Sequence, residues 1–292
     1  MRSDIEFPSG GLTCRGWYYR PEGEGRHPAV LMSPGFSAVK EQKLANFAER
    51  FAAEGFAVVV FDYRHLGASD GSPRGRIIPQ LQHDDLRAAL DFMLKTPEID
   101  PARIGLWGSA YSGGHALWVG ALDPRVKAIV AQVPAIGIAR SLLMMYGRPE
   151  FDSLLVSLAA EHAARNAGVD DRTMPVVSQD GRAFLPTSDS FVWFTAAAAA
   201  LNWKNQVTME SVARAIEYMP AAFIELIAPK PLLIQAAERD ALIPIGDVRT
   251  AFARAREPKK LEVYDCGHYD LYDGPLHQTA QQAQVDWWRQ TL

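Results

Sequence analysis

The sequence has few of the features that define membrane, secreted or disulfide-bonded proteins. Two cysteines among 292 residues, Cys14 and Cys266, are too few for a framework of disulfides. No apolar run is long enough to cross a bilayer. The N-terminal stretch MRSDIEFPSGG lacks the apolar segment of a signal peptide. We therefore expect no membrane partner and a cytoplasmic location.

An excess of charge of one sign is also absent. The chain has 30 Lys and Arg against 34 Asp and Glu, which gives a formal net charge of −4, and it has no basic cluster. Because binding to nucleic acid needs a basic face, we expect no nucleic-acid partner. Hydrophobic residues make up 48% of the chain and charged residues 22%, which is typical of a folded globular protein and not of a disordered one.

Motifs for cofactors and metals are missing as well. The sequence contains no glycine-rich phosphate-binding loop of the P-loop or dinucleotide type. The stretch from His83 to Asp85 could suggest metal ligands, but adjacent positions on a helix point in different directions. No further ligand stands at a suitable spacing from it. We expect neither a metal nor a cofactor.

What the sequence does have is a regular alternation of apolar strands and amphipathic helices. Continuously apolar, β-branched runs such as FAVVVF alternate with helical patterns over residues 27–134 and again over 230–292. This order predicts βαβ units, and therefore an α/β fold with a mostly parallel sheet flanked by helices. An antiparallel hairpin is expected over residues 4–21.

The stretch from 135 to 228 interrupts this alternation. It contains several helix-like segments and no clear strand, so we interpret it as an inserted helical cap. The predicted core domain then consists of residues 1–134 and 229–292, and the cap of residues 135–228.

One expected strand ends in the stretch WGSAYSGG. Gly108 stands two positions before residue 110, and Ser112, Gly113 and Gly114 follow it. This spacing is typical of a nucleophile elbow, a strained turn between strand and helix where bulky neighbours would clash. The residue in the nucleophile's position is Ala110, which has no reactive atom.

Two later strand ends carry an acid and a base. Asp240 stands in ERDALIP and His268 in CGHYD, each just past an expected strand. In open parallel sheets, functional residues gather at the carboxyl ends of the strands. The order of nucleophile position, acid and histidine is the order that an α/β-hydrolase uses.

With these motifs the chain resembles the α/β-hydrolases, and among them the cap-bearing bacterial esterases related to dienelactone hydrolases and Xaa-Pro peptidases. The stretches that carry the resemblance are LMSPGFSAVKEQ, VFDYRHLGASDGSPR, DPARIGLWGSAYSGG, ERDALIP and CGHYDLY. The resemblance implies the α/β-hydrolase fold with an inserted cap. It also implies that His268 transfers protons, that Asp240 orients it, and that the backbone N–H groups of Phe36 and Tyr111 form an oxyanion hole.

The resemblance implies a serine, or less often a cysteine, where Ala110 stands. We interpret Ala110 as the replacement of a wild-type serine, which leaves an inactive variant with its acid and base in place. Two alternatives stay open: that Ser112 or Ser109 is the nucleophile of a shifted elbow, and that the chain is a natural, non-catalytic receptor for a ligand. A shifted elbow would move Gly108 into the strand, where glycine weakens packing.

The expected function is that of a serine-type carboxylic ester or lactone hydrolase, which works through an acyl-enzyme on a medium-sized apolar small molecule. Thioesterase, amidase or peptidase, and C–C bond hydrolase are alternatives that use the same triad. The apolar residues of the cap that we expect to contact substrate are Met144, Met145, Phe191, Trp193 and Trp203. A homodimer stays open, since relatives are often dimers and no exposed strand edge or heptad indicates a surface.

Overall fold

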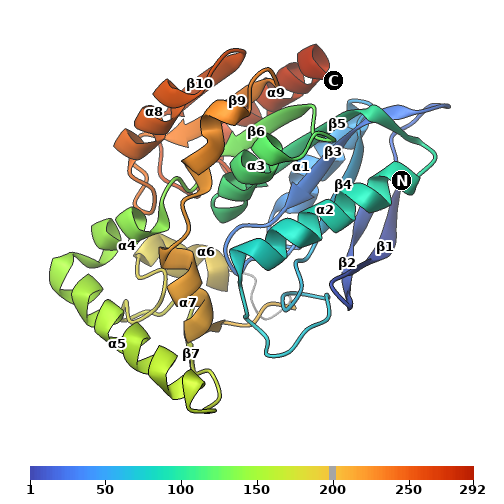
Figure 1. The fold of residues 1–292 in the computed structure, drawn as a ribbon. Helices are drawn as coiled ribbons and strands as arrows, with labels where there is room; N and C mark the ends of the chain where they lie inside the picture. The colour runs from blue at the N-terminus through green and yellow to red at the C-terminus, as the bar shows by residue number, and fades with distance from the viewer. Residues whose placement is uncertain (197–201) are drawn as a thin grey trace.

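In the computed structural model, which describes residues 1–196 and 202–292, the chain folds around a sheet of eight strands (Figure 1). Neighbouring strands follow the order β1-β2-β4-β3-β5-β6-β9-β10. In chain order the strands are β1 (Arg2–Ser9), β2 (Leu12–Tyr19), β3 (His27–Ser33), β4 (Ala57–Phe61), β5 (Ile99–Ser109), β6 (Ala128–Gln132), β9 (Leu232–Ala237) and β10 (Lys259–Tyr264). Strand β2 pairs antiparallel with β1 and β4, and the other neighbouring pairs are parallel. The predicted mostly parallel sheet is confirmed.

Helices cover both faces of this sheet, which explains why the central strands β3, β4, β6 and β9 are apolar without alternation. Val30 and Met32 of β3 belong to one buried cluster with residues of the first and last helices. Leu31, which lies between them, belongs to a second cluster on the opposite face. The helices that flank the sheet are α1 (Leu44–Ala53), α2 (Pro79–Lys95), α3 (Tyr111–Leu122), α8 (Ile245–Arg254) and α9 (Pro275–Thr291).

The segment 135–228 lies beyond the carboxyl ends of the parallel strands (Figure 1). Its elements are α4 (Ile138–Tyr146), α5 (Arg148–Asn166), β7 (Thr173–Met174), α6 (Ser188–Thr195), β8 (Val207–Thr208), α7 (Met209–Ile216) and the 3-10 helix η2 (Pro220–Leu226). The short antiparallel pair β7–β8 is an addition to the predicted helices, because two-residue strands leave no periodic pattern. The stretch SFVWFTAAAAALNW at 190–203 is one of the helix-like segments of the sequence. Helix α6 ends at Thr195 within it, and residues 197–201 lie outside the described residues.

The start of α7 anchors this cap segment to the loop that precedes α2. Arg76 forms a bidentate ion pair with Glu210, with N–O distances of 2.8 and 3.2 Å. The backbone N–H of Ile77 donates to Ser211 Oγ over 2.7 Å. Both partners in the cap lie in the first turn of α7, which fixes where the cap chain returns towards the core.

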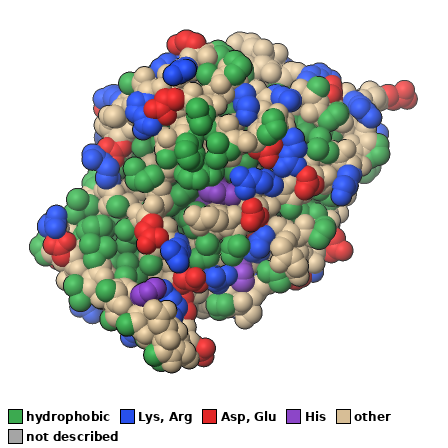
Figure 2. Space-filling model, in the orientation of Figure 1, with side chains coloured by type: hydrophobic (Ala, Val, Ile, Leu, Met, Phe, Trp, Pro, Cys, Tyr) green, Lys and Arg blue, Asp and Glu red, His purple; other side chains and the backbone are tan. Residues whose placement is uncertain are grey.

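No described helix combines the length and apolar character needed to span a bilayer. On the face shown in Figure 2, acidic and basic side chains are interspersed, and apolar side chains gather in several places between them.

Two buried histidines hold the end of the cap segment against the core. Tyr218, which follows α7, has its hydroxyl 2.8 Å from His83 Nε2 and 2.9 Å from His115 Nδ1. Gln82 Oε1 lies 2.9 Å from His115 Nε2. Since an amide oxygen only accepts, His115 carries its proton on Nε2 and accepts on Nδ1 from Tyr218. His83 then donates from Nε2 to the tyrosine, and the network requires a neutral His115, because its Nδ1 must accept.

This network predicts a loss of stability in acid. Burial lowers the pKa of His83 to about 3 and holds the pKa of His115 well below its ordinary value. Below pH 6.5 these two histidines bind protons in the unfolded chain but stay neutral in the folded chain. The free energy of unfolding should therefore fall by up to about 1.4 kcal/mol per pH unit for each histidine.

Urea unfolding followed between pH 7 and pH 5 measures this slope. The His83→Gln variant should show a shallower slope than the parent chain, whatever its stability at pH 7. The matched control is His162→Gln, because His162 lies exposed on α5. An equal slope in all three proteins would contradict the assignment of neutral histidines.

Candidate active site

The turn between β5 and α3 has a strained backbone at one residue. Ala110 has φ 53° and ψ −118°, a conformation that L-amino acids rarely adopt. Its N–H donates to Gln132 O over 3.0 Å, and its own carbonyl accepts from Gly114 N and Ala135 N over 3.1 and 2.9 Å. The surrounding chain therefore fixes the strained residue from both sides.

Glycines leave the space that this turn needs. A Cβ on Gly113 would lie 2.9 Å from Pro134 Cα, and one on Gly114 would lie 2.7 Å from the ring of Pro220. A Cβ on Gly108 would overlap the backbone carbonyl of Ser112. The predicted elbow is therefore present, with residue 110 at its apex and α3 packed close behind it.

The predicted acid and base meet at the same edge of the sheet. His268 Nδ1 donates to Asp240 Oδ2 over 2.7 Å, and both side chains are almost fully buried. The second oxygen, Asp240 Oδ1, accepts from the backbone N–H groups of Leu242 and Ile243 over 2.8 and 2.9 Å. The carboxylate is thus held in one orientation, and its contact with Nδ1 leaves Nε2 of His268 as the nitrogen available for proton exchange.

Ala110 and His268 open into one apolar cavity. The other residues of its wall come from α3, from the cap and from the loops after β3, β9 and β10: Gly35, Phe36, Ala38, Tyr111, Ala135, Ile138, Ser141, Leu142, Met145, Phe184, Leu185, Trp193, Phe194, Leu242, Ile243, Tyr269 and Tyr272. The cavity has about 600 Å³ of empty space, its open mouth included. This lining suits an apolar group.

Two backbone N–H groups flank the apex of the elbow. Tyr111 is the first residue of α3, so its N–H has no acceptor within the helix. The N–H of Phe36 makes no hydrogen bond within residues 1–196 and 202–292. The two side chains pack edge to face at 5.1 Å, and Phe36 also stacks on Phe184 of the cap at 4.2 Å. Both residues therefore line the same cavity as Ala110, and the oxyanion hole stays a prediction.

The two serines of the alternative elbow are not candidates for the nucleophile. Ser112 is buried inside α3, donates to Pro34 O and lies 2.9 Å from the hydroxyl of Tyr63. Ser109 is buried at the end of β5, and its Oγ accepts from Gln132 over 3.1 Å. Strand β5 ends at Ser109, and the strained residue that follows it is Ala110. The shifted elbow is a wrong reading, because neither serine lines the cavity.

Of the cap residues expected to contact substrate, Met145 and Trp193 line the cavity. Met144 is exposed, because neighbouring residues on α4 point about 100° apart. Phe191 packs against the buried core next to the cavity and does not line it. Trp203 packs on Phe194 at 5.2 Å and faces a separate, smaller hollow behind the loop that carries Phe36.

Several wall residues were not expected from the sequence. Tyr269 and Tyr272 follow His268 in the motif CGHYDLY, so their place beside the histidine could have been found from it. Burial raises the pKa of Tyr272, so its hydroxyl stays protonated at neutral pH and can donate a hydrogen bond. Phe184 and Leu185 lie in an irregular loop of the cap, where no periodicity marks them.

No metal or thiol chemistry is indicated at this site. The described residues contain no group of three His, Cys, Asp or Glu side chains placed to hold a metal ion. Cys266, two residues before His268, is buried, and burial raises its pKa to about 11. It is therefore a protonated core thiol at neutral pH.

Solved structures place this arrangement among known folds. The crystal structure of the α/β-hydrolase GrgF from Penicillium sp. sh18 matches 100% of this chain and 99% of its own, with a TM-score of 0.85 and 28% identity. A hypothetical protein from Pseudomonas aeruginosa matches 100% of this chain and 94% of its own, with a TM-score of 0.84 and 27% identity. The protein is an α/β-hydrolase.

Sequence comparison then assigns the family. Residues 17–214 match the profile of the X-Pro dipeptidyl-peptidase (S15) family, so the chain belongs to that hydrolase family. It is 30% identical over 289 residues to the quorum-quenching protein AidA of Acinetobacter baumannii, which covers 97% of this chain and 93% of the relative. It is 29% identical over 297 residues to the thiohydrolase aneE of Aspergillus aculeatus, with coverages of 97% and 91%.

The elbow packing predicts that Gly108 tolerates no side chain. Gly108→Ala should lower the free energy of unfolding by about 1–3 kcal/mol, because its methyl group would displace the first turn of α3. Gly246→Ala on α8 is the matched control, since a Cβ there meets nothing within 4 Å. That change should be neutral or stabilise by up to about 1 kcal/mol. Urea denaturation of both variants measures the difference, and equal effects would contradict a tightly packed elbow.

Proposed function

We propose that the cavity is the acyl-binding site of a serine-type hydrolase of carboxylic esters or lactones. The observation that supports this most is that the strained apex at Ala110 and the His268–Asp240 pair open into the same apolar cavity. A backbone bent in this way brings a residue-110 side chain in front of the imidazole. His268 thus faces a cavity whose walls are mostly apolar.

With serine at position 110, each neighbouring group has a defined part in the reaction. His268 Nε2 takes the proton of the serine hydroxyl as its oxygen attacks the carbonyl carbon, and then returns the proton to the leaving group. Asp240 keeps the imidazole in the correct tautomer and stabilises its cationic form. The N–H groups of Phe36 and Tyr111 donate to the oxyanion of the tetrahedral intermediate. A water molecule then attacks the acyl-enzyme in the same way: His268 takes a proton from the water and returns it to the serine oxygen as the acid leaves.

The walls of the cavity indicate which half of the substrate they hold. Ile138, Leu142 and Met145 of α4 and Phe194 of α6 offer no charge to a sugar or a phosphate. We therefore assign the cavity to an uncharged acyl group. A thioester is the alternative with most support, because a relative over nearly the whole chain is named a thiohydrolase. Amides and activated C–C bonds remain further alternatives for the same triad.

Ala110 limits what the chain can do as it stands. A methyl group cannot attack a carbonyl carbon, so we propose that this form binds its substrate without forming an acyl-enzyme, and that serine is the active residue at this position. The second candidate function, a ligand-binding receptor on a hydrolase frame, is favoured by the same alanine. The two candidate functions differ in the effect of a serine hydroxyl at position 110: it restores ester hydrolysis in a hydrolase and has no such effect in a receptor.

The Ala110→Ser variant should gain ester hydrolysis on the order of 10⁴- to 10⁶-fold, since loss of a triad nucleophile costs about this much. The rate is measured with p-nitrophenyl esters of increasing acyl length and with the matching thioesters. The serine variant should also show a burst of product that reports an acyl-enzyme.

The controls are Ala110→Ser combined with His268→Gln, and Ala110→Ser combined with Asp240→Asn. Each second change should remove most of the gained activity, and the loss should be smaller for the aspartate than for the histidine. Tight ligand binding in both the alanine and serine forms, with no turnover in either, would favour the receptor. If the Ala110 chain hydrolyses esters and the His268→Gln change does not reduce that activity, the proposed triad is contradicted.

A further inference from the structure

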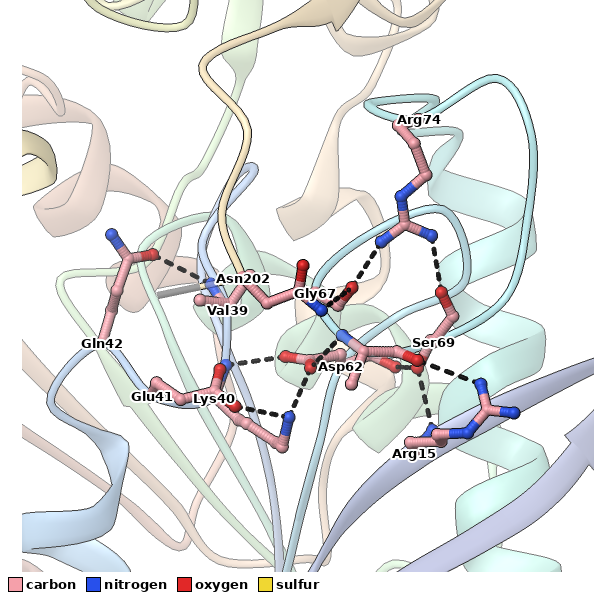
Figure 3. Close-up of polar contacts among 11 residues, drawn as sticks. Arg15, Val39, Lys40, Glu41, Gln42, Asp62, Gly67, Ser69, Arg74 and Asn202 are labelled. Carbon is pink, nitrogen blue, oxygen red and sulfur yellow. Dashed lines mark hydrogen bonds and ion pairs between the residues drawn. The ribbon is translucent and has the colours of Figure 1, made fainter. Parts of the chain in front are cut away.

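A buried carboxylate ties the loop that carries Phe36 to the end of β4. We call residues 34–42, between β3 and α1, the oxyanion loop. Asp62, directly after β4, accepts from the backbone N–H of Lys40 at Oδ1 and from Lys40 Nζ at Oδ2, both over 2.7 Å (Figure 3). The carboxylate thus binds both the main chain and the side chain of one loop residue. Asp62 is fully buried and Lys40 is 4% exposed.

The oxyanion loop needs such a support, because its own backbone is strained. Ser37, next to Phe36, has a φ of 58°, and Lys43 after the loop has a φ of 69°. Within the loop, Gln42 Oε1 accepts from Val39 N over 2.9 Å (Figure 3), and two backbone hydrogen bonds join Ala38 N to Gly35 O and Gln42 N to Val39 O. These contacts stay inside the loop, whereas Asp62 ties it to the end of β4.

The same carboxylate also holds the loop after β4. Asp62 Oδ2 accepts from Ala68 N over 2.9 Å, and the main-chain oxygen of Asp62 accepts from Ser69 Oγ over 2.5 Å. Gly67 lies against the carboxylate with a φ of 49°, where a Cβ would overlap the Asp62 oxygens. The oxyanion loop and the loop after β4 are therefore packed on opposite sides of one charged group.

The cap reaches this group through Gly67. The carbonyl of Gly67 accepts from Asn202 Nδ2 of the cap over 2.8 Å and from Arg74 Nη2 over 2.6 Å (Figure 3). A continuous chain of contacts therefore runs from Asn202 through Gly67 and Asp62 to the oxyanion loop.

Stability alone is a poor explanation for this ion pair. Moving a carboxylate and an ammonium out of water costs about as much as their attraction returns, so buried pairs add little net stability. What such a pair does provide is a fixed geometry, since an alternative position of the loop would leave a charge buried without its partner.

We propose that Asp62 is a positioning residue of the hydrolytic site: by holding Lys40, it keeps the N–H of Phe36 aimed at the developing oxyanion and ties that loop to the cap. This inference rests on the proposed function, because it assigns Phe36 to the oxyanion hole. It adds a residue that does not touch the substrate and that no part of the triad requires.

The test uses Asp62→Asn in the full chain with Ala110→Ser. Displacing one oxyanion donor should lower kcat about 10- to 100-fold, while KM changes much less. The affinity for an alkylboronic acid, which forms a tetrahedral adduct with the serine, should fall by a similar factor. Binding of the uncleaved ester to the Ala110 chain should hardly change, because the ground state makes little use of the oxyanion hole.

The matched control is Asp85→Asn, which breaks an equally buried ion pair between Asp85 and Arg64, with an N–O distance of 2.7 Å. It should cost similar stability and leave the boronic-acid affinity and kcat near those of the Ala110→Ser parent. Equal losses of kcat in the two variants would overturn the inference and leave the proposed function intact.

Amide hydrogen exchange in the Ala110 chain separates the two proposals. Asp62→Asn should speed exchange across residues 34–42 well beyond Asp85→Asn, whether or not serine restores turnover. If Ala110→Ser is inactive, the proposed function fails while the exchange result still decides whether Asp62 holds the loop. Unchanged exchange in Asp62→Asn would overturn the positioning role directly.

Discussion

The strained backbone at Ala110 is the constraint on which the rest of this site depends. A conformation with φ near 53° costs on the order of 1–3 kcal/mol for a residue with a side chain. The conformation persists because the surrounding structure fixes it. The N–H and carbonyl of Ala110 are hydrogen-bonded to neighbouring elements, and the glycines before and after it let α3 pack against the end of β6. Without that strain, the side chain at this position would lie in the helix or the strand and not in the cavity.

The rest of the sheet provides a rigid support for this turn. Three buried glutamines from different elements bond to one another: Gln284 of α9 donates to Gln132 of β6 over 2.9 Å and to Gln235 of β9 over 2.6 Å. Gln284 also accepts from the indole of Trp107 on β5 over 2.9 Å. Because each of these amides is buried, a shift of one strand would leave unpaired polar groups, so the strands that carry the site keep their relative positions.

Charge is used differently in the core and at the surface. Ion pairs such as Arg148–Asp152 lie in water, where screening and side-chain entropy leave them little effect on folding. The Lys40–Asp62 pair is shielded from water, so its geometry is far more restrictive. The neutral pair His83 and His115 shows a third solution, in which burial suppresses the charge altogether and hydrogen bonds to Tyr218 and Gln82 satisfy the rings.

The fold class and the edge of the sheet that carries the candidate functional residues follow from the sequence alone. Apolar periodicity is a property of neighbouring residues, and the ends of successive parallel strands must lie at one edge of a sheet. The sequence alone therefore predicts that Ala110, Asp240 and His268 lie at one edge of the sheet. Only the tertiary structure decided which side chains of the cap face the cavity, as the different positions of Met144 and Met145 show. It also decided that Asp62 holds the oxyanion loop. Those contacts join segments far apart in the chain, and their energies depend on burial and direction, which no local pattern of residues records.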